Sequence, residues 1–290
     1  MSDSLSPQPD TPLHVGMFDS GLGGLSVLKA ALRDMPGASF TYLADSGFAP
    51  YGHRPAAVIV DRSERIGEYL LQLGADMVVV ACNTATTQAI ASLRKRWPHA
   101  HWVGVEPGIK PAVKSTRNGR VGVMATPGTL SSARYAELLR QHAPHITCVG
   151  VACEGLAGAI EGGPATAHLV ESLLDLYCAQ MSAHKVDTVV LGCTHYPLVA
   201  DQIRQRLPSQ TVLIDTAEAV SRRIRHLASS HMPLDAARVA TPVAAQLQLL
   251  STGDPSLLAQ MATQHLGLGA LEASSAPNTL RPPAQSIHAR

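Results

Sequence analysis

The sequence predicts an α/β fold built from two similar halves, each with a mostly parallel sheet flanked by helices. Short apolar runs, rich in β-branched residues, alternate along the chain with stretches of helical periodicity. This alternation is typical of parallel α/β sheets. Several of these segments also recur in the same order in the second half of the chain. The length, 290 residues, suggests about two domains.

The predicted strands are continuous and apolar, as expected for strands that are buried on both faces. They cover residues 15–18, 40–44, 77–80, 121–124, 188–191 and 211–214. The spacing of apolar residues predicts helices over 56–73, 131–141 and 166–182.

The internal repeat is the most informative feature of the sequence. Three pairs of segments match in order: 15–18 with 121–124, 76–82 with 187–193, and 94–98 with 204–208. Apolar strands recur in any α/β fold, but that alternative does not explain why a cysteine ends the same strand twice. Functional residues of open α/β sheets lie beyond the carboxyl ends of the strands. Cys82 and Cys193 are therefore expected to face one cleft between the two halves, and we place the active site there.

Composition favours a small-molecule partner. The chain has 23 basic and 22 acidic residues, a net charge of +1, which gives no footprint for nucleic acid or for an anionic membrane. No apolar run is long enough for a transmembrane helix, and residues 1–12 lack the pattern of a secretory signal, so we expect a cytoplasmic protein. The five cysteines are an odd, sparse set without a C-x-x-C pair, and free thiols are expected.

Both cysteines have polar neighbours. Cys82 is followed by Asn83 and Thr84 at the expected start of a helix, where backbone N–H groups and the helix dipole favour an anion such as a substrate carboxylate or a thiolate. Cys193 is followed by Thr194 and His195 in the same plan. A lone cysteine after a strand is usually a small buried hydrophobe, but two at equivalent positions favour chemistry. Two thiols and a histidine could also hold zinc, and the spacing leaves that open, although we expect no metal.

Other polar residues follow the remaining strands. Asp19 and Ser20 precede a glycine-rich turn that lacks the full dinucleotide motif, because Ser26 stands at its third glycine position. That turn can also be read as a tight turn that needs glycine dihedral angles. Asp19 could bind an ammonium group or assist proton transfer. The loop with Pro50, Tyr51 and Gly52 could close over the cleft or be an ordinary turn, and Thr126 follows the strand that matches that of Asp19.

Two acid–base groups on opposite faces of one carbon can remove a proton from one side and return one to the other, which inverts the stereocentre. The two cysteines fit this scheme. None of the motifs contains a lysine, so a pyridoxal Schiff base has no evident anchor and no cofactor is expected.

The chain resembles the glutamate racemases over about residues 13–269. The likeness is carried by the segments 15–27, 50–52, 82–86, 104–107, 192–197 and 251–254, which read VGMFDSGLGGLSV, PYG, CNTAT, GVEP, GCTHYP and STGD. It implies a cofactor-independent racemase that supplies D-glutamate for peptidoglycan, with Cys82 acting on the D-enantiomer and Cys193 on the L-enantiomer. It implies three assisting residues, Asp19, Glu161 and His195; composition alone makes Glu161 an ordinary surface acid. Substrate contacts are implied for Asp19, Ser20, Pro50, Tyr51, Gly52, Asn83, Thr84, Thr126, Thr194 and His195.

The resemblance also implies a domain plan in which the chain returns to the first domain after the second. We expect residues 13–107 with 214–269 to form one domain and 108–213 the other, with flexible extensions at 1–12 and 270–290, and a homodimer. Two other functions stay open: a racemase of a related carbon acid, such as aspartate or a hydantoin, and a binding module without turnover.

Overall fold

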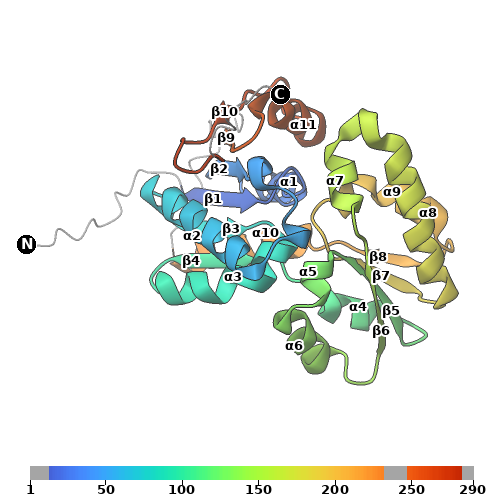
Figure 1. Ribbon diagram of the computed structural model, residues 1–290. Helices are drawn as coiled ribbons and strands as arrows, with labels where there is room; N and C mark the ends of the chain where they lie inside the picture. Colours follow the sequence, from blue (N-terminus) through green and yellow to red (C-terminus); the bar gives the residue numbers. More distant parts are fainter. Residues whose placement is uncertain (1–12, 232–246, 283–290) are drawn as a thin grey trace, which may run out of the picture.

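The computed structural model describes residues 13–231 and 247–282, and it contains two parallel sheets, one in each half of the chain, flanked by helices (Figure 1). The predicted fold class is thereby confirmed. Residues 1–12, expected to be flexible, lie outside the described residues. Among the described residues, no helix is long and apolar enough to cross a membrane.

The first sheet has six strands in the order β10-β9-β2-β1-β3-β4, and all neighbours are parallel. The strands are β1 (His14–Asp19), β2 (Ser39–Ala44), β3 (Met77–Val80), β4 (His101–Gly104), β9 (Leu247–Ser251) and β10 (Ser274–Ser275). The central strands are buried on both faces, which explains their continuous apolar sequence.

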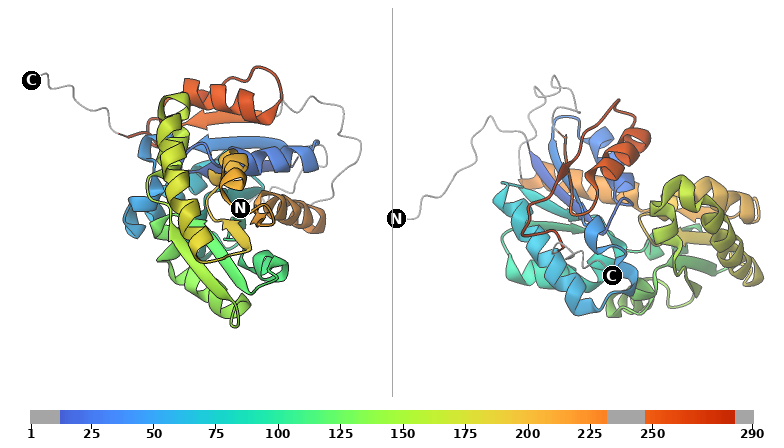
Figure 2. Two further views of the ribbon diagram at one scale, coloured as in Figure 1. Left: turned by 90° about the vertical axis from the view of Figure 1, so that its right-hand side faces the viewer. Right: turned by 45° about the horizontal axis from the view of Figure 1, so that its top comes forward.

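Alternate side chains of these strands enter two separate cores. Met17 and Val79 pack under α1 (Leu25–Asp34), α10 (Ala217–His231) and α11 (Pro255–Leu266). Phe18 and Val80 pack on the other face, under α2 (Ala56–Gln72) and α3 (Asn83–Arg96). The helices therefore cover both faces of the first sheet (Figures 1 and 2).

The second sheet has four parallel strands in the order β6-β5-β7-β8. They are β5 (Arg120–Ala125), β6 (Thr147–Ala152), β7 (Thr188–Leu191) and β8 (Val212–Ile214). One face is covered by α7 (Leu156–Glu161), α8 (Ala167–Ala183) and α9 (Ala200–Arg206), and the other by α4 (Ile109–Ser115) and α6 (Ala133–His142). The short helix α5 (Pro127–Leu130) follows β5.

The internal repeat of the sequence corresponds to a repeat of the fold. The order β6-β5-β7-β8 matches β2-β1-β3-β4 of the first sheet, so the two strands that end before the cysteines, β3 and β7, occupy equivalent places. After β8 the chain returns to the first half through α10, which packs against α1. Ile214 pairs with Val190 in the second sheet, one residue past the expected boundary at 213.

Residues 270–282 are packed against the first half, and the expectation of a flexible extension is wrong for them. β10 adds a strand to the edge of the sheet by pairing with β9. Ala276 and Leu280 are 2% and 4% exposed and join the core beneath α2 and α3. The segment is rich in Ala, Ser and Pro, and this composition gave no indication that Ala276 and Leu280 would be buried. Residues 283–290 lie outside the described residues.

Candidate active site

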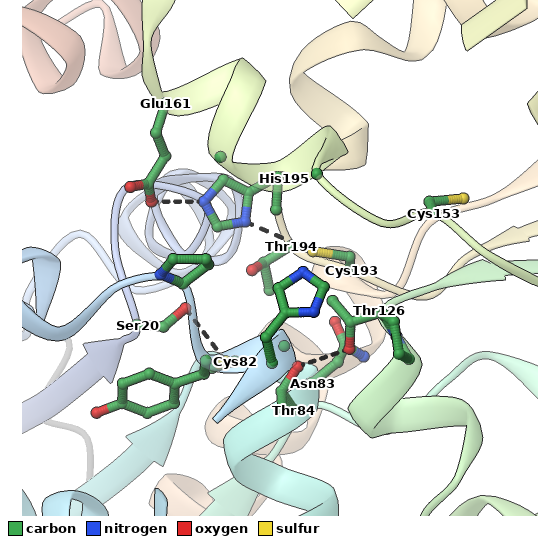
Figure 3. Close-up of a pocket in the computed structure, with 18 residues that line it drawn as sticks. Ser20, Cys82, Asn83, Thr84, Thr126, Cys153, Glu161, Cys193, Thr194 and His195 are labelled. Atoms are coloured by element: carbon green, nitrogen blue, oxygen red, sulfur yellow. Dashed lines mark hydrogen bonds and ion pairs between the residues drawn. The ribbon is translucent and has the colours of Figure 1, made fainter. Parts of the chain in front are cut away.

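A cavity of about 60 Å³ lies where the carboxyl ends of the central strands of both sheets meet (Figure 3). Both cysteines line it, one from each half, as the repeat predicts. It is also lined by ten other residues singled out from the sequence: Ser20, Pro50, Tyr51, Gly52, Asn83, Thr84, Thr126, Glu161, Thr194 and His195.

Cys82 follows β3 and caps the N-terminus of α3. Its Sγ accepts a hydrogen bond from the backbone N–H of Ala85 at 3.5 Å, and the thiol donates to Ser20 Oγ at 3.6 Å. Burial, reinforced by the negative charge of Asp19, raises the pKa of the Cys82 thiol well above its ordinary value. Cys82 is therefore a protonated acid at neutral pH.

Cys193 has a different partner. Its Sγ lies 3.5 Å from His195 Nδ1, and His195 Nε2 lies 2.7 Å from Glu161 Oε1 (Figure 3). Burial by itself would lower the pKa of His195, but the charges and hydrogen bonds of Cys193 and Glu161 outweigh it and raise the pKa well above 6.5. The imidazole is thus held between the Cys193 sulfur and the Glu161 carboxylate.

Glu161 joins this group to the other half of the molecule. It lies at the end of α7, and its Oε1 accepts the backbone N–H of Leu22 at 2.8 Å. A Cβ at Gly21 would lie 1.6 Å from the same oxygen, and a Cβ at Gly23 would lie 2.5 Å from His195 Nδ1. Neither Gly21 nor Gly23 has a positive φ angle. They allow the close approach of the second half, and they are not needed for unusual dihedral angles.

Asp19 ends β1 and is completely buried. It accepts hydrogen bonds from the Gly24 backbone N–H at 2.7 Å, from Ser20 Oγ at 3.4 Å and from Thr194 Oγ1 at 3.5 Å. Among the described residues it is not one of those that line the cavity, so it lies behind Ser20. Burial raises its pKa, although the nearby His195 works in the opposite direction.

The remaining polar groups form a site for a small polar ligand. Thr84 Oγ1 of the first half lies 2.9 Å from Thr126 Oγ1 of the second. Asn83 donates to the Val105 carbonyl at 3.1 Å, and its buried Oδ1 accepts no hydrogen bond within the described chain. A Cβ at Gly52 would lie 3.0 Å from Thr126 Cβ, so the Pro50–Gly52 loop lies against the hydroxyl pair.

Part of the cavity wall is formed by residues that were not predicted from the sequence. His53 and Pro127 adjoin predicted residues, whereas Cys153 and Gly155 come from the turn after β6, and Ala157 and Gly158 come from α7. Cys153 has no counterpart in the repeat, so the pattern held no signal for this wall. Among residues 13–231 and 247–282, no group of three His, Cys, Asp or Glu side chains is placed to hold a metal ion.

Comparison with known sequences identifies one family of racemases. The sequence profile of the Asp/Glu/Hydantoin racemase family matches residues 22–224. A glutamate racemase of Pseudomonas aeruginosa is 44% identical over 228 residues, which cover 79% of this chain and 86% of that protein. The glutamate racemase of Ectopseudomonas mendocina is 42% identical over 260 residues, covering 87% and 97%.

Solved structures agree with the sequence relatives. The glutamate racemase isoform RacE1 of Bacillus anthracis superposes with a TM-score of 0.82 at 26% identity, covering 93% of this chain and 99% of that one. The Escherichia coli glutamate racemase, solved with L-glutamate and the activator UDP-MurNAc-Ala, gives a TM-score of 0.76 at 30% identity, covering 91% and 98%. The chain therefore belongs to the Asp/Glu/Hydantoin racemase family, and its sequence relatives and fold are those of the glutamate racemases.

Proposed function

We propose that this chain interconverts L- and D-glutamate by a two-base mechanism that needs no cofactor, and that it supplies D-glutamate for peptidoglycan. The observation that carries the proposal is the pair of buried thiols, Cys82 and Cys193, which line one cavity from equivalent places in the two halves. Inversion requires one acid–base group on each face of the α-carbon, and this arrangement supplies them.

The reaction moves one proton at each face. For L-glutamate, the Cys193 thiolate takes the α-proton while the Cys82 thiol gives its proton to the opposite face of the carbanion. The product is D-glutamate, with Cys193 now a thiol and Cys82 a thiolate, and the reverse reaction restores the starting state. The surroundings of the two thiols support this division, because the raised pKa of Cys82 keeps it an acid whereas the Sγ of Cys193 lies 3.5 Å from His195 Nδ1.

The polar wall supports an amino-acid substrate. The backbone N–H groups at the start of α3 and the hydroxyls of Thr84 and Thr126 can donate to a carboxylate. The unpartnered Oδ1 of Asn83 can accept a hydrogen bond from the substrate ammonium. Asp19 would act through Ser20 and Thr194, which touch the cavity in its place.

Glutamate is favoured over other carbon acids by the relatives, which are glutamate racemases at 40–44% identity, and by the Escherichia coli enzyme solved with L-glutamate. The homodimer and the cytoplasmic location remain predictions.

The test is a polarimetric assay of the purified chain with pure L-glutamate and, separately, pure D-glutamate. Both rotations should decay to zero. L-aspartate and a chiral hydantoin are the matched controls, and they should be turned over far more slowly. Faster racemisation of either control would overturn the substrate assignment, and a constant rotation with every substrate would overturn catalysis.

A further inference from the structure

We infer that the C-terminal segment, residues 274–282, is a positioning element for the active site: it holds the loop that carries Tyr51 and Gly52 against the cavity, through Arg62 and Asp45. Its effect on turnover rests on the proposed function, whereas its effect on the loop does not.

The C-terminal segment is anchored at two points. The backbone N–H of Ala276 donates to the Ser251 carbonyl at 2.7 Å, which continues the pairing of β10 with β9. Leu280 is buried in the core that also contains Tyr51 and Ile59. A fully buried leucine contributes about 1.5–3 kcal/mol relative to an exposed one, so this contact is strong enough to fix a short segment.

Arg62 of α2 joins the segment to the loop. Its Nη2 donates to the Leu280 carbonyl at 2.7 Å and to Asp45 Oδ1 at 2.6 Å, while its Nε donates to Asp45 Oδ2 at 3.0 Å. The guanidinium also lies over the Phe48 ring, 3.7 Å from its centre. Both members of this ion pair are buried, so each depends on the other and on the remaining hydrogen bonds.

Asp45 carries the connection to the cavity. Its Oδ2 accepts the hydroxyl of Tyr51 at 2.5 Å, and its Oδ1 accepts the hydroxyl of Thr252 at 2.8 Å. Tyr51 is 1% exposed and lines the cavity with Gly52. One unbroken set of hydrogen bonds therefore runs from the Leu280 carbonyl through Arg62 and Asp45 to Tyr51.

The start of the loop is also enclosed by the C-terminal part of the chain. Gly47 donates its backbone N–H to Thr252 Oγ1 at 3.1 Å. A Cβ at Gly47 would lie 2.7 Å from the Thr252 carbonyl oxygen and 2.9 Å from Pro282 Cδ. Release of the C-terminal segment thus removes the Pro282 contact at Gly47 and the Leu280 carbonyl from Arg62, which weakens the support of the loop at both ends and leaves both thiols untouched.

The experiment compares Leu280→Ala with two matched variants in the full chain. Leu280→Met keeps the apolar volume, and Thr279→Ala changes the exposed neighbour. Leu280→Ala should raise KM for both enantiomers about tenfold, the size expected for loss of one hydrogen bond to a charged group. Its kcat should stay within about threefold, because the acid–base groups are unchanged. Leu280→Met and Thr279→Ala should match the wild type.

Hydrogen–deuterium exchange tests the loop without substrate. In Leu280→Ala the amides of residues 46–54 should exchange faster, while those of β5 keep the wild-type rate. If thermal melting shows that Leu280→Ala does not fold, Arg62→Lys carries the test, since one ammonium cannot replace the forked donors that reach both Asp45 and Leu280.

The outcomes separate the two proposals. Wild-type turnover with unchanged exchange and KM in the folded variant would overturn the positioning role. Faster exchange of residues 46–54 in a protein that never racemises glutamate would support the positioning of the loop and overturn the proposed function. A fall in kcat with unchanged KM would show a general structural role and would also overturn the positioning role.

Discussion

Glu161 Oε1 lies 2.7 Å from His195 Nε2 and at the same time accepts the backbone N–H of Leu22 from the other half of the molecule. The carboxylate that supports the imidazolium beside Cys193 is therefore also a contact between the two halves. Several variants can separate the chemical from the geometric part of this arrangement.

Replacing either Cys82 or Cys193 by alanine should abolish racemisation in both directions, because inversion needs both faces of the α-carbon. Proton exchange should survive selectively: Cys193→Ala should still exchange the α-proton of D-glutamate for deuterium, and Cys82→Ala that of L-glutamate. NMR of each pure enantiomer in D₂O measures this. A loss of about 10²–10⁴-fold is expected from each general acid–base group. Cys148→Ala, at a half-buried thiol outside the cavity, should keep activity. Identical selectivity in the two variants would contradict the assignment.

Glu161→Gln should lower the pKa of His195, because an amide can accept the hydrogen bond but carries no charge. In the wild type the folded-state pKa is raised, so His195 contributes stability that is present below about pH 6.5 and is lost as pH rises through the folded-state value. In Glu161→Gln the stability contributed by His195 should be lost at a lower pH. The alkaline limb of kcat/KM for L-glutamate should also move to lower pH. Urea unfolding and pH–rate profiles measure the two shifts. The exposed Glu68→Gln on α2 is the control, and equal profiles for both variants would refute the role of Glu161.

Gly21→Ala should reduce activity much more than stability. The new Cβ would meet Glu161 Oε1 and force the carboxylate away from His195 and Leu22. Overpacking of this kind costs about 1–3 kcal/mol, whereas misplaced catalytic groups can cost about 10²-fold in rate. Thermal melting measures the effect on stability, and kcat/KM measures the effect on activity. Gly150→Ala, on exposed β6 with side-chain atoms of Leu130 nearest, should change neither greatly. Wild-type kcat/KM in Gly21→Ala would show that the close approach is unnecessary.

Incubation with EDTA followed by removal of the chelate should leave turnover unchanged, and pyridoxal phosphate should not increase it. The reason is that, in the proposed mechanism, thiols supply both proton transfers. Polarimetry before and after treatment is the measurement, with a known zinc enzyme treated in parallel. Activity that is lost on chelation and restored by zinc would overturn the two-base mechanism.

The sequence predicted the buried parts of the fold best. β3 and β7 begin and end at the predicted residues, because a strand covered on both faces must be apolar throughout. β6 was not predicted, since it lies at an edge and most of its side chains are exposed or half-buried. The C-terminal segment was misjudged because two buried side chains, Ala276 and Leu280, are too few to produce a periodic pattern.

The same distinction applies to the candidate site. Cys82 and Cys193 were found from the repeat, which reports equivalent places in two sheets. Glu161 came from the family resemblance alone, because its role depends on a contact with Leu22 that is 139 residues away in the chain. Asp19 was expected to contact the substrate, and among the described residues it is not one of those that line the cavity, since a position at the end of a strand does not show which side chains fill the space in front.

The two thiols belong to separate halves that meet at the cavity. Hydrogen bonds join the halves there, among them those of Leu22 with Glu161, Asp19 with Thr194, and Thr84 with Thr126. Any rotation of one half against the other would lengthen these contacts together. Cys193 would keep His195 and Glu161, and Cys82 would keep Ser20, because these partners belong to the same half as each thiol. Under the proposed mechanism each half therefore carries the groups for one proton transfer, and inversion depends on the contacts that hold the halves together.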